Sequence, residues 1–396
     1  MKHTTQLIAV GAIAALTLTA CASTPGENET EETPQTSRVS LTYDGGILVL
    51  DGTTLEVEAD IPLEGFNRLN PAGDGRHALV TTTAGFQVLD LGTWTDSEGS
   101  HVAAPKLTDL VFEAEAAGHV VRHDGKTILF ADGTGDTTIF ETAALLEGGL
   151  PETEVVVSEE AHHGVAIELA DGTLLTTLGN SDTRTGVRAL DASRSEVDRN
   201  EQCPSVHGEG AAANEVAVFG CSDGVLIYDS GEFVKVQSPD VYGRTGNQYV
   251  SETSTIAVGD YNSDPDSEGY LLTELVFIDT VAKTSSVVDL PEGVSYTWRG
   301  VGRGPSNEVL VLSSDGSLYQ LDETTGDVTN SWAVIDPWES PVEWQDAHPA
   351  LTINGSIAYV TEPATNEIHA IDLTTGDVTV SATLDAAPNE IAVVTG

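Results

Sequence analysis

The sequence predicts an all-β protein, an eight-bladed β-propeller, and three observations support this fold class. No stretch of the chain body shows the long apolar period of a helix. Short strand-like segments alternate instead with Asp-Gly and Asn-Gly turns, which are typical of β-hairpins. An apolar strand end followed by an acid also recurs eight times. The eight acids are Asp51, Asp90, Glu141, Asp191, Asp229, Asp279, Asp322 and Asp372.

The spacing of these acids indicates one structural unit per repeat. Successive acids lie 38 to 51 residues apart, which matches one four-stranded propeller blade. The two clearest copies continue with the same six residues, at 324–329 and 374–379. A β-sandwich or a two-domain all-β protein fits such regular spacing poorly. We therefore expect eight blades, with seven as the alternative.

The two ends of the predicted propeller complement each other. Residues 388–394 resemble the inner strand of a blade with nothing after it. Residues 38–61 supply strands and the first acid, but no inner strand precedes them. Pairing the two ends would complete one blade and remove two exposed sheet edges. We expect the ring to close in this way.

The N-terminus has the pattern of a secretory signal. Lys2 precedes an apolar run over residues 7–18, which is too short to span a bilayer permanently. The run ends in Leu-Thr-Ala-Cys, which resembles the bacterial lipobox and predicts lipidation of Cys21. An ordinary signal peptide is the alternative. The protein is thus expected outside the cytoplasmic membrane, anchored at Cys21 or secreted.

Three segments follow from this pattern. Residues 1–20 are the predicted signal peptide. Residues 21–37 form a lipidated Cys and a flexible acidic tether, because this stretch cannot bury an apolar core. Residues 38–396 form a single propeller domain.

The net charge limits the possible partners. The chain has 63 acidic residues against 16 Lys and Arg, a formal charge of −47. Such a surface repels nucleic acids and anionic membranes, so contact with a membrane is expected only through the lipid anchor. We expect a monomer. Adaptation to a salt-rich habitat is an alternative reason for this acidity.

Two cysteines remain once Cys21 is set aside. Cys203 and Cys221 form an even pair in an oxidising compartment, which predicts a disulfide. Two thiolate metal ligands are the weaker alternative, because the pair has no Cys-x-x-Cys spacing.

Four histidines fall into register with the repeat. His119, His163, His207 and His348 lie 22, 28, 22 and 24 residues before the acid of their own repeat. In a propeller this offset is the start of the innermost strand, where side chains face the mouth of the central channel. Three of these blades are adjacent, and His348 lies across the ring from His163.

Imidazoles that converge in this way point to a metal. Three or four imidazoles suit Zn²⁺ or Cu²⁺, and we expect a zinc site formed by the four histidines. Asp346 and Glu209 could complete or support the site, and His162 could be a supporting group. The alternative is that each histidine only forms a hydrogen bond with a neighbouring blade. The off-register histidines, such as His123 and His369, are expected to be surface or structural residues.

The segments around these histidines resemble a known family. The words GHVVRHDGKTILFADG, AHHGVAIELADG, CPSVHGEG and DAHPAL are similar to those of AztD proteins, secreted zinc metallochaperones. The resemblance covers residues 66–396. It implies a propeller without catalytic activity that binds Zn²⁺ and passes it to the solute-binding protein of a zinc ABC importer. Residues 22–37 contain no His, so the additional N-terminal metal site of some relatives is doubtful here.

Two other classes of function stay open from the residues alone. One is a non-catalytic propeller that binds proteins or glycans at its outer surface. The other is a zinc hydrolase, which would need a positioned general base and a substrate cleft. The sequence shows neither a Ser nucleophile elbow nor a phosphate-binding Gly loop, so we favour the metallochaperone.

Overall fold

The computed structural model describes Met1, residues 36–267 and residues 269–396. Residues 35–396 form one compact unit. The predicted signal peptide, Cys21 and most of the tether lie outside the described residues. In the described part of the chain, no helix has the length and apolar character needed to cross a membrane.

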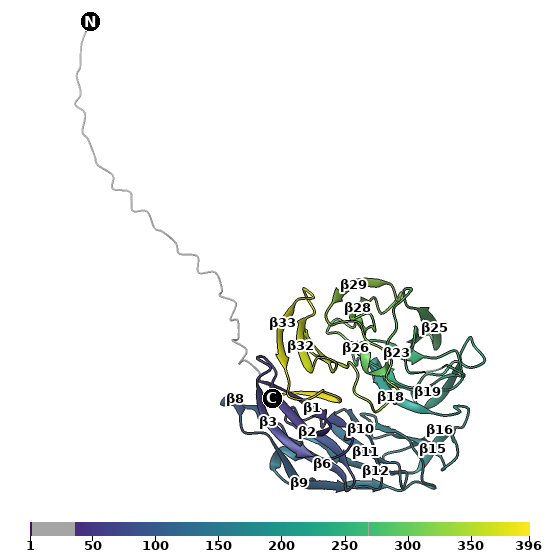
Figure 1. Ribbon diagram of the computed structural model, residues 1–396. Helices are drawn as coiled ribbons and strands as arrows, with labels where there is room; N and C mark the ends of the chain where they lie inside the picture. Colours follow the sequence, from purple (N-terminus) through teal and green to yellow (C-terminus); the bar gives the residue numbers. More distant parts are fainter. Residues whose placement is uncertain (2–35, 268) are drawn as a thin grey trace. The chain divides into compact units, whose positions relative to one another are not determined.

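Eight four-stranded antiparallel sheets are arranged in a ring, which confirms the eight-bladed propeller (Figure 1). The first two blades, each from its inner strand outward, are β34 (Ile391–Thr395), β1 (Ser37–Tyr43), β2 (Gly45–Asp51) and β3 (Val57–Leu63), then β4 (Leu69–Pro71), β5 (His77–Thr82), β6 (Gly85–Asp90) and β9 (Lys106–Glu113). The next two are β10 (Ala117–His123), β11 (Lys126–Ala131), β12 (Asp136–Glu141) and β13 (Glu154–Val156), then β14 (Ala166–Glu168), β15 (Leu174–Gly179), β16 (Arg184–Leu190) and β17 (Glu196–Asn200).

The other four blades repeat this order. The fifth and sixth are β18 (His207–Ala212), β19 (Val216–Cys221), β20 (Gly224–Asp229) and β21 (Glu232–Gln237), then β22 (Gln248–Tyr249), β23 (Ile256–Tyr261), β24 (Glu274–Asp279) and β25 (Thr284–Asp289). The seventh and eighth are β26 (Val301–Arg303), β27 (Val309–Leu312), β28 (Ser317–Leu321) and β29 (Val328–Ala333), then β30 (Leu351–Asn354), β31 (Ile357–Glu362), β32 (Glu367–Asp372) and β33 (Val378–Thr383). An extra hairpin pairs β7 (Thr93–Asp96) with β8 (Gly99–Val102), inserted in the second blade. Three short 3₁₀ helices complete the described elements: η1 (Thr142–Glu147), η2 (Ala213–Glu215) and η3 (Trp298–Gly300).

The ring closes through its two ends, as predicted. Strand β34 pairs antiparallel with β1, with Ala392 opposite Ser40. Both edges that the ends would otherwise expose are therefore hydrogen-bonded.

The repeated acids have a local structural role. Each ends or directly follows the third strand of its blade, at the turn into the outer strand. Asp51 Oδ1, for example, accepts hydrogen bonds from the backbone N–H groups of Thr53 and Thr54, both at 2.9 Å. Asp322 Oδ1 does the same for Thr324 and Thr325. Asp191 and Asp279 also accept from two turn amides, which favours an acid at this position.

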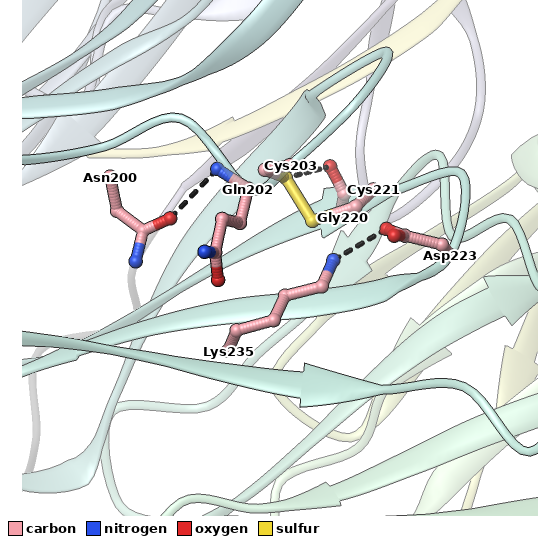
Figure 2. Close-up of a disulfide and its surroundings, with 7 residues drawn as sticks. All are labelled: Asn200, Gln202, Cys203, Gly220, Cys221, Asp223 and Lys235. Atoms are coloured by element: carbon pink, nitrogen blue, oxygen red, sulfur yellow. Dashed lines mark hydrogen bonds and ion pairs between the residues drawn. A yellow bond between two sulfur atoms is a disulfide. The ribbon is translucent and has the colours of Figure 1, made fainter.

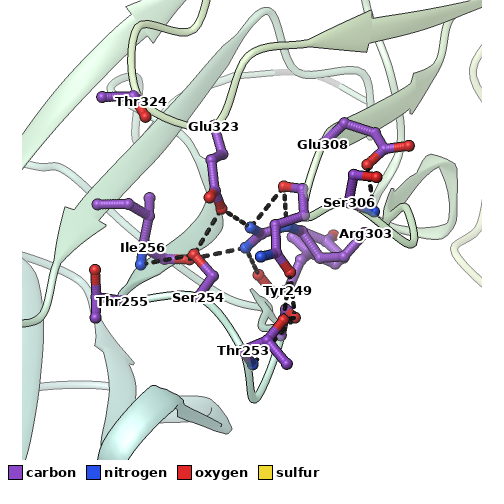
Figure 3. Close-up of polar contacts among 12 residues, drawn as sticks. Tyr249, Thr253, Ser254, Thr255, Ile256, Arg303, Ser306, Glu308, Glu323 and Thr324 are labelled. Carbon is purple, nitrogen blue, oxygen red and sulfur yellow. Dashed lines mark hydrogen bonds and ion pairs between the residues drawn. The ribbon is translucent and has the colours of Figure 1, made fainter.

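Neighbouring blades are joined by apolar packing and by polar contacts. Between the seventh and eighth blades, Leu310 and Leu312 pack in one buried cluster with Val360. Between the sixth and seventh, Arg303 donates to the backbone oxygen of Ile256 at 2.8 Å, while it pairs with Glu323 of its own blade (Figure 3). These contacts join neighbouring blades close to the channel.

A disulfide joins Cys203, in the loop before β18, to Cys221 at the end of β19, which confirms the predicted pair (Figure 2). The bridge lies within the blade that carries His207. Both cysteines are fully buried.

Candidate metal centre

Three of the four predicted histidines come together at one end of the channel. One ligand nitrogen each from His119, His163 and His207 can be chosen so that all lie within 4.8 Å of one another. The centroids of the three rings are 4.9 to 5.3 Å apart. We call this group the histidine triad. It is drawn from three consecutive blades, through β10, the loop before β14, and β18.

Glycines beside the histidines allow the backbone to approach closely. A Cβ atom on Gly118 would lie 2.3 Å from Asp132 Oδ1, so only glycine leaves room for this carboxylate. Gly208 has a φ of +70°, and a Cβ there would lie 2.5 Å from the backbone oxygen of Gly246. Irregular strand pairing interrupts β10 next to His119 and β18 next to His207. Such bulges re-aim side chains, here those at the start of an inner strand.

Hydrogen bonds hold two rings of the triad in a defined orientation. His163 Nδ1 lies 2.6 Å from Asp132 Oδ2, and His207 Nδ1 lies 2.5 Å from the backbone oxygen of Gly246. Because both partners are acceptors, each Nδ1 carries the proton and Nε2 keeps its lone pair for a metal.

The sequence did not single out Asp132, which stands in an ordinary Asp-Gly turn. The register of the hairpin could have revealed Asp132. Because Ala117 pairs with Ala131, Asp132 stands opposite the start of β10, close to His119.

The substitution Asp132→Asn is expected to weaken zinc binding by about 10- to 100-fold, the usual cost of losing a carboxylate behind a ligating histidine. An amide cannot stabilise the ring as an anion does, and it also presents an NH₂ group. Zinc titration by isothermal calorimetry would measure the effect. A Kd within twofold of the wild-type value would show that Asp132 does not support the ring.

Two half-buried rings of the triad, those of His119 and His207, are held in their neutral form. Burial lowers the pKa of His119 well below its usual range, and the neighbouring rings of His207 and His163 and the charge of Arg68 lower it further. Burial likewise lowers the pKa of His207 to about 3, against the opposing hydrogen bond to Gly246. Desolvation disfavours the charged imidazolium. At neutral pH both rings are therefore in the only form that binds a metal.

The donor set and its spacing suit zinc. Two ligands at 2.0–2.1 Å from one tetrahedral zinc ion lie roughly 3.4 Å apart. The triad nitrogens lie within 4.8 Å of one another, so small ring movements would close the site. Three imidazoles leave one tetrahedral position for a further ligand. The side chain of His163 is 43% exposed, which makes the site accessible from solvent.

Two triad histidines open onto a channel cavity of about 300 Å³. His119, His207 and Glu209 line this cavity, together with Arg68, just before β4, and Glu390, just before β34. Glu209 is not one of the grouped ligands. Burial raises the pKa of Glu209 to about 8, so its carboxyl group is protonated at neutral pH in the metal-free protein.

His348 does not join the triad, contrary to the expectation of a four-histidine site. It precedes β30 in the eighth blade, and His163 belongs to the fourth, so the ring of eight places them on opposite sides of the channel. His348 Nδ1 instead donates to the backbone oxygen of Asp346 at 2.7 Å. The carboxylate of Asp346 accepts from the backbone N–H of Glu343, so it does not reach the triad.

His162 lies inside the fourth blade, away from the ligand position. Its Nδ1 lies 2.9 Å from the backbone oxygen of Glu160, and its Nε2 lies 3.1 Å from that of Thr177. Its ring packs edge-on against Phe130. His162 therefore contacts the backbone beside His163 rather than a ligating ring.

Comparison with known proteins places this site in context. The chain is 26% identical over 337 residues to the zinc chaperone AztD of Citrobacter koseri, covering 81% of this chain and 75% of the relative. The chain is similar to AztD over most of its length. No protein-family model matches it.

Solved structures agree with the AztD fold. The apo AztD structure from Citrobacter koseri has a TM-score of 0.76 and 22% identity, covering 91% of this chain and 98% of that one. A second Citrobacter koseri AztD structure has the same TM-score and 21% identity, covering 92% and 99%. The dihydro-heme d1 dehydrogenase NirN has a TM-score of 0.59 and 12% identity, covering 94% of this chain and 78% of NirN. At these identities the structures show the shared propeller fold.

Proposed function

We propose that this protein is an extracytoplasmic zinc metallochaperone that holds Zn²⁺ on the histidine triad. The observation that carries the proposal is the triad itself, three imidazoles from three blades within ligand distance at the channel mouth. The similarity to a zinc chaperone supports Zn²⁺ as the bound metal. The acceptor is the solute-binding protein of a zinc ABC importer. The chain acts as a monomer, anchored to the membrane at Cys21 after removal of residues 1–20.

The chemistry of transfer follows from the incomplete coordination. The triad supplies three ligands, and the fourth position stays open to a His or carboxylate of a docked acceptor. Ligands then exchange one at a time, so that zinc is never released as a free ion. Exposed His163 is the first triad ligand that an acceptor would displace, because His119 and His207 are held by burial.

The site supports a carrier better than a hydrolase. A zinc hydrolase needs a general base beside the metal-bound water. Glu209 lines the same cavity, but its carboxylate is not grouped with the ligand atoms of the triad. The remaining alternative, a propeller that binds proteins or glycans on its outer surface, predicts no stoichiometric zinc.

The affinity of the protein for zinc is expected to fall only slightly between pH 7 and pH 5. Lowered pKa values keep His119 and His207 neutral in this window, so protons compete for at most one of the three ligands. The plot of log Kd against pH should therefore have a slope no steeper than one. Three ordinary imidazoles would approach a slope of three near pH 5. Equilibrium dialysis at pH 7, 6 and 5 would measure the slope, and a value of two or more would contradict the neutral triad.

Direct transfer is the test of chaperone function. Zinc-loaded protein is mixed with the metal-free solute-binding protein, and a parallel sample keeps the two on opposite sides of a dialysis membrane. We expect much faster transfer in the mixed sample, because ligand exchange requires contact. Equal rates would show that zinc passes only by free diffusion, which would refute the chaperone mechanism.

A further inference from the structure

A second group of metal-ligating side chains lies in the eighth blade, outside the triad. Ligand atoms of Glu362, Glu367 and His369 lie within 4.8 Å of one another. Glu362 ends β31 and pairs directly with Glu367, which begins β32. His369 follows two residues later on β32, and residues two apart in a strand share a face. The hairpin therefore presents all three side chains on one face.

The charge balance of this group is unusual. Glu362 is 7% exposed and His369 is 8% exposed. Among the described residues, neither Glu362 nor Glu367 pairs with a Lys or Arg, and His369 is the one basic group within ion-pair distance of Glu362. Glu362 Oε1 accepts a hydrogen bond from the backbone N–H of Asp336 at 3.0 Å, but among the described residues no Lys or Arg balances the two adjacent carboxylates.

A separate observation points to a ligand in the cavity that Glu362 lines. Glu362 and His348 line one cavity of about 630 Å³, together with Trp338. His348 is 3% exposed, and its Nε2 is buried with no hydrogen-bond partner among the described residues. Its Nδ1 donates to the backbone oxygen of Asp346, so Nε2 is a free lone pair. A buried imidazole lone pair without a partner is available to a metal ion that enters this cavity.

We propose that Glu362, Glu367 and His369 form a second site for a divalent transition metal, next to the cavity that Glu362 and His348 both line. His369 Nε2 lies 3.2 Å from Glu362 Oε2, close to the roughly 3.4 Å that separates two ligands of one tetrahedral ion. In the metal-free protein these two atoms share a hydrogen bond, and the metal takes the place of that proton. Mixed imidazole and carboxylate donors suit Zn²⁺ or Co²⁺ better than Mg²⁺ or Ca²⁺.

Metal stoichiometry of the full chain tests the second site independently of the triad. By equilibrium dialysis with Co²⁺ or Zn²⁺, the wild type should bind two ions. The variant His119→Ala/His163→Ala/His207→Ala should keep one, and adding Glu362→Gln and His369→Gln should remove it. His101→Ala is the matched control, because His101 also pairs with a carboxylate, that of Asp96, but belongs to neither group.

The outcomes separate the two proposals. A folded triad variant that binds no metal, or one that keeps its ion after Glu362→Gln and His369→Gln, would overturn the second site. A wild type with one ion that is lost only with Glu362→Gln and His369→Gln would confirm the second site and refute the triad. Circular dichroism would show that each variant is folded.

Tryptophan fluorescence can report metal binding at the second site without any substitution of Glu362, Glu367 or His369. The Trp338 ring lies 6.4 Å from that of His348, so Co²⁺ at the second site should quench it. In the triad variant we expect saturable quenching by Co²⁺ that Trp338→Phe abolishes. Quenching that survives Trp338→Phe, or its absence in the triad variant, would contradict a metal at this cavity.

Discussion

Replacing His207 with Ala is expected to weaken zinc binding by more than ~100-fold, because loss of a direct ligand should cost more than loss of a supporting partner. His207 is the triad ring whose orientation and neutral form are both held by its surroundings, through the bond to Gly246 and through burial. Two imidazoles would remain, and solvent would have to supply the missing ligand. Calorimetric titration with Zn²⁺ at pH 7 measures the change in Kd.

His101→Ala is again the control for this experiment, since His101 lies on the β8 hairpin with a carboxylate partner. It should leave the Kd of the triad unchanged. Thermal unfolding of metal-free His207→Ala should stay close to that of the metal-free wild type. If His207→Ala binds zinc as tightly as His101→Ala does, the triad is not the primary zinc site.

Removing the disulfide should have the largest effect on stability. In the chain-entropy model, a crosslink over a sequence separation of 18 residues contributes about 3 kcal/mol to the free energy of unfolding. We expect Cys203→Ala/Cys221→Ala to lose about that amount. The comparison is urea unfolding of the metal-free double variant and of the metal-free wild type, with and without reductant.

The same variant should also bind zinc about tenfold more weakly, as expected for loss of a supporting contact. His207 pairs with Gly220, the residue before Cys221, so the bridge fixes the strand opposite the ligand. Reduced wild-type protein should reproduce both changes. An unchanged urea midpoint would show that the bridge does not constrain the unfolded chain, and an unchanged Kd would show that packing alone positions His207.

Features set by short segments of chain could be predicted well. An acid stands at the end of each third strand and in most blades accepts from amides of the following turn, as Asp51 does, so its recurrence counts the blades. The pairing of β34 with β1 follows from one unpaired inner strand and one blade that lacks it. His119 and His207 stand at the start of an inner strand, as their distances from the acids predicted.

Features that depend on distances across the ring required the tertiary structure. His348 has the same offset as the triad, yet it stands on the far side of the channel and faces a different cavity. The support of His163 by Asp132, and the protonated state of Glu209, also depend on contacts or burial that no local pattern records. Turn chemistry and strand alternation act within one blade, so residue order is enough to reveal them. Whether side chains from different blades share one ion depends on the number of blades and the width that their packing gives the channel.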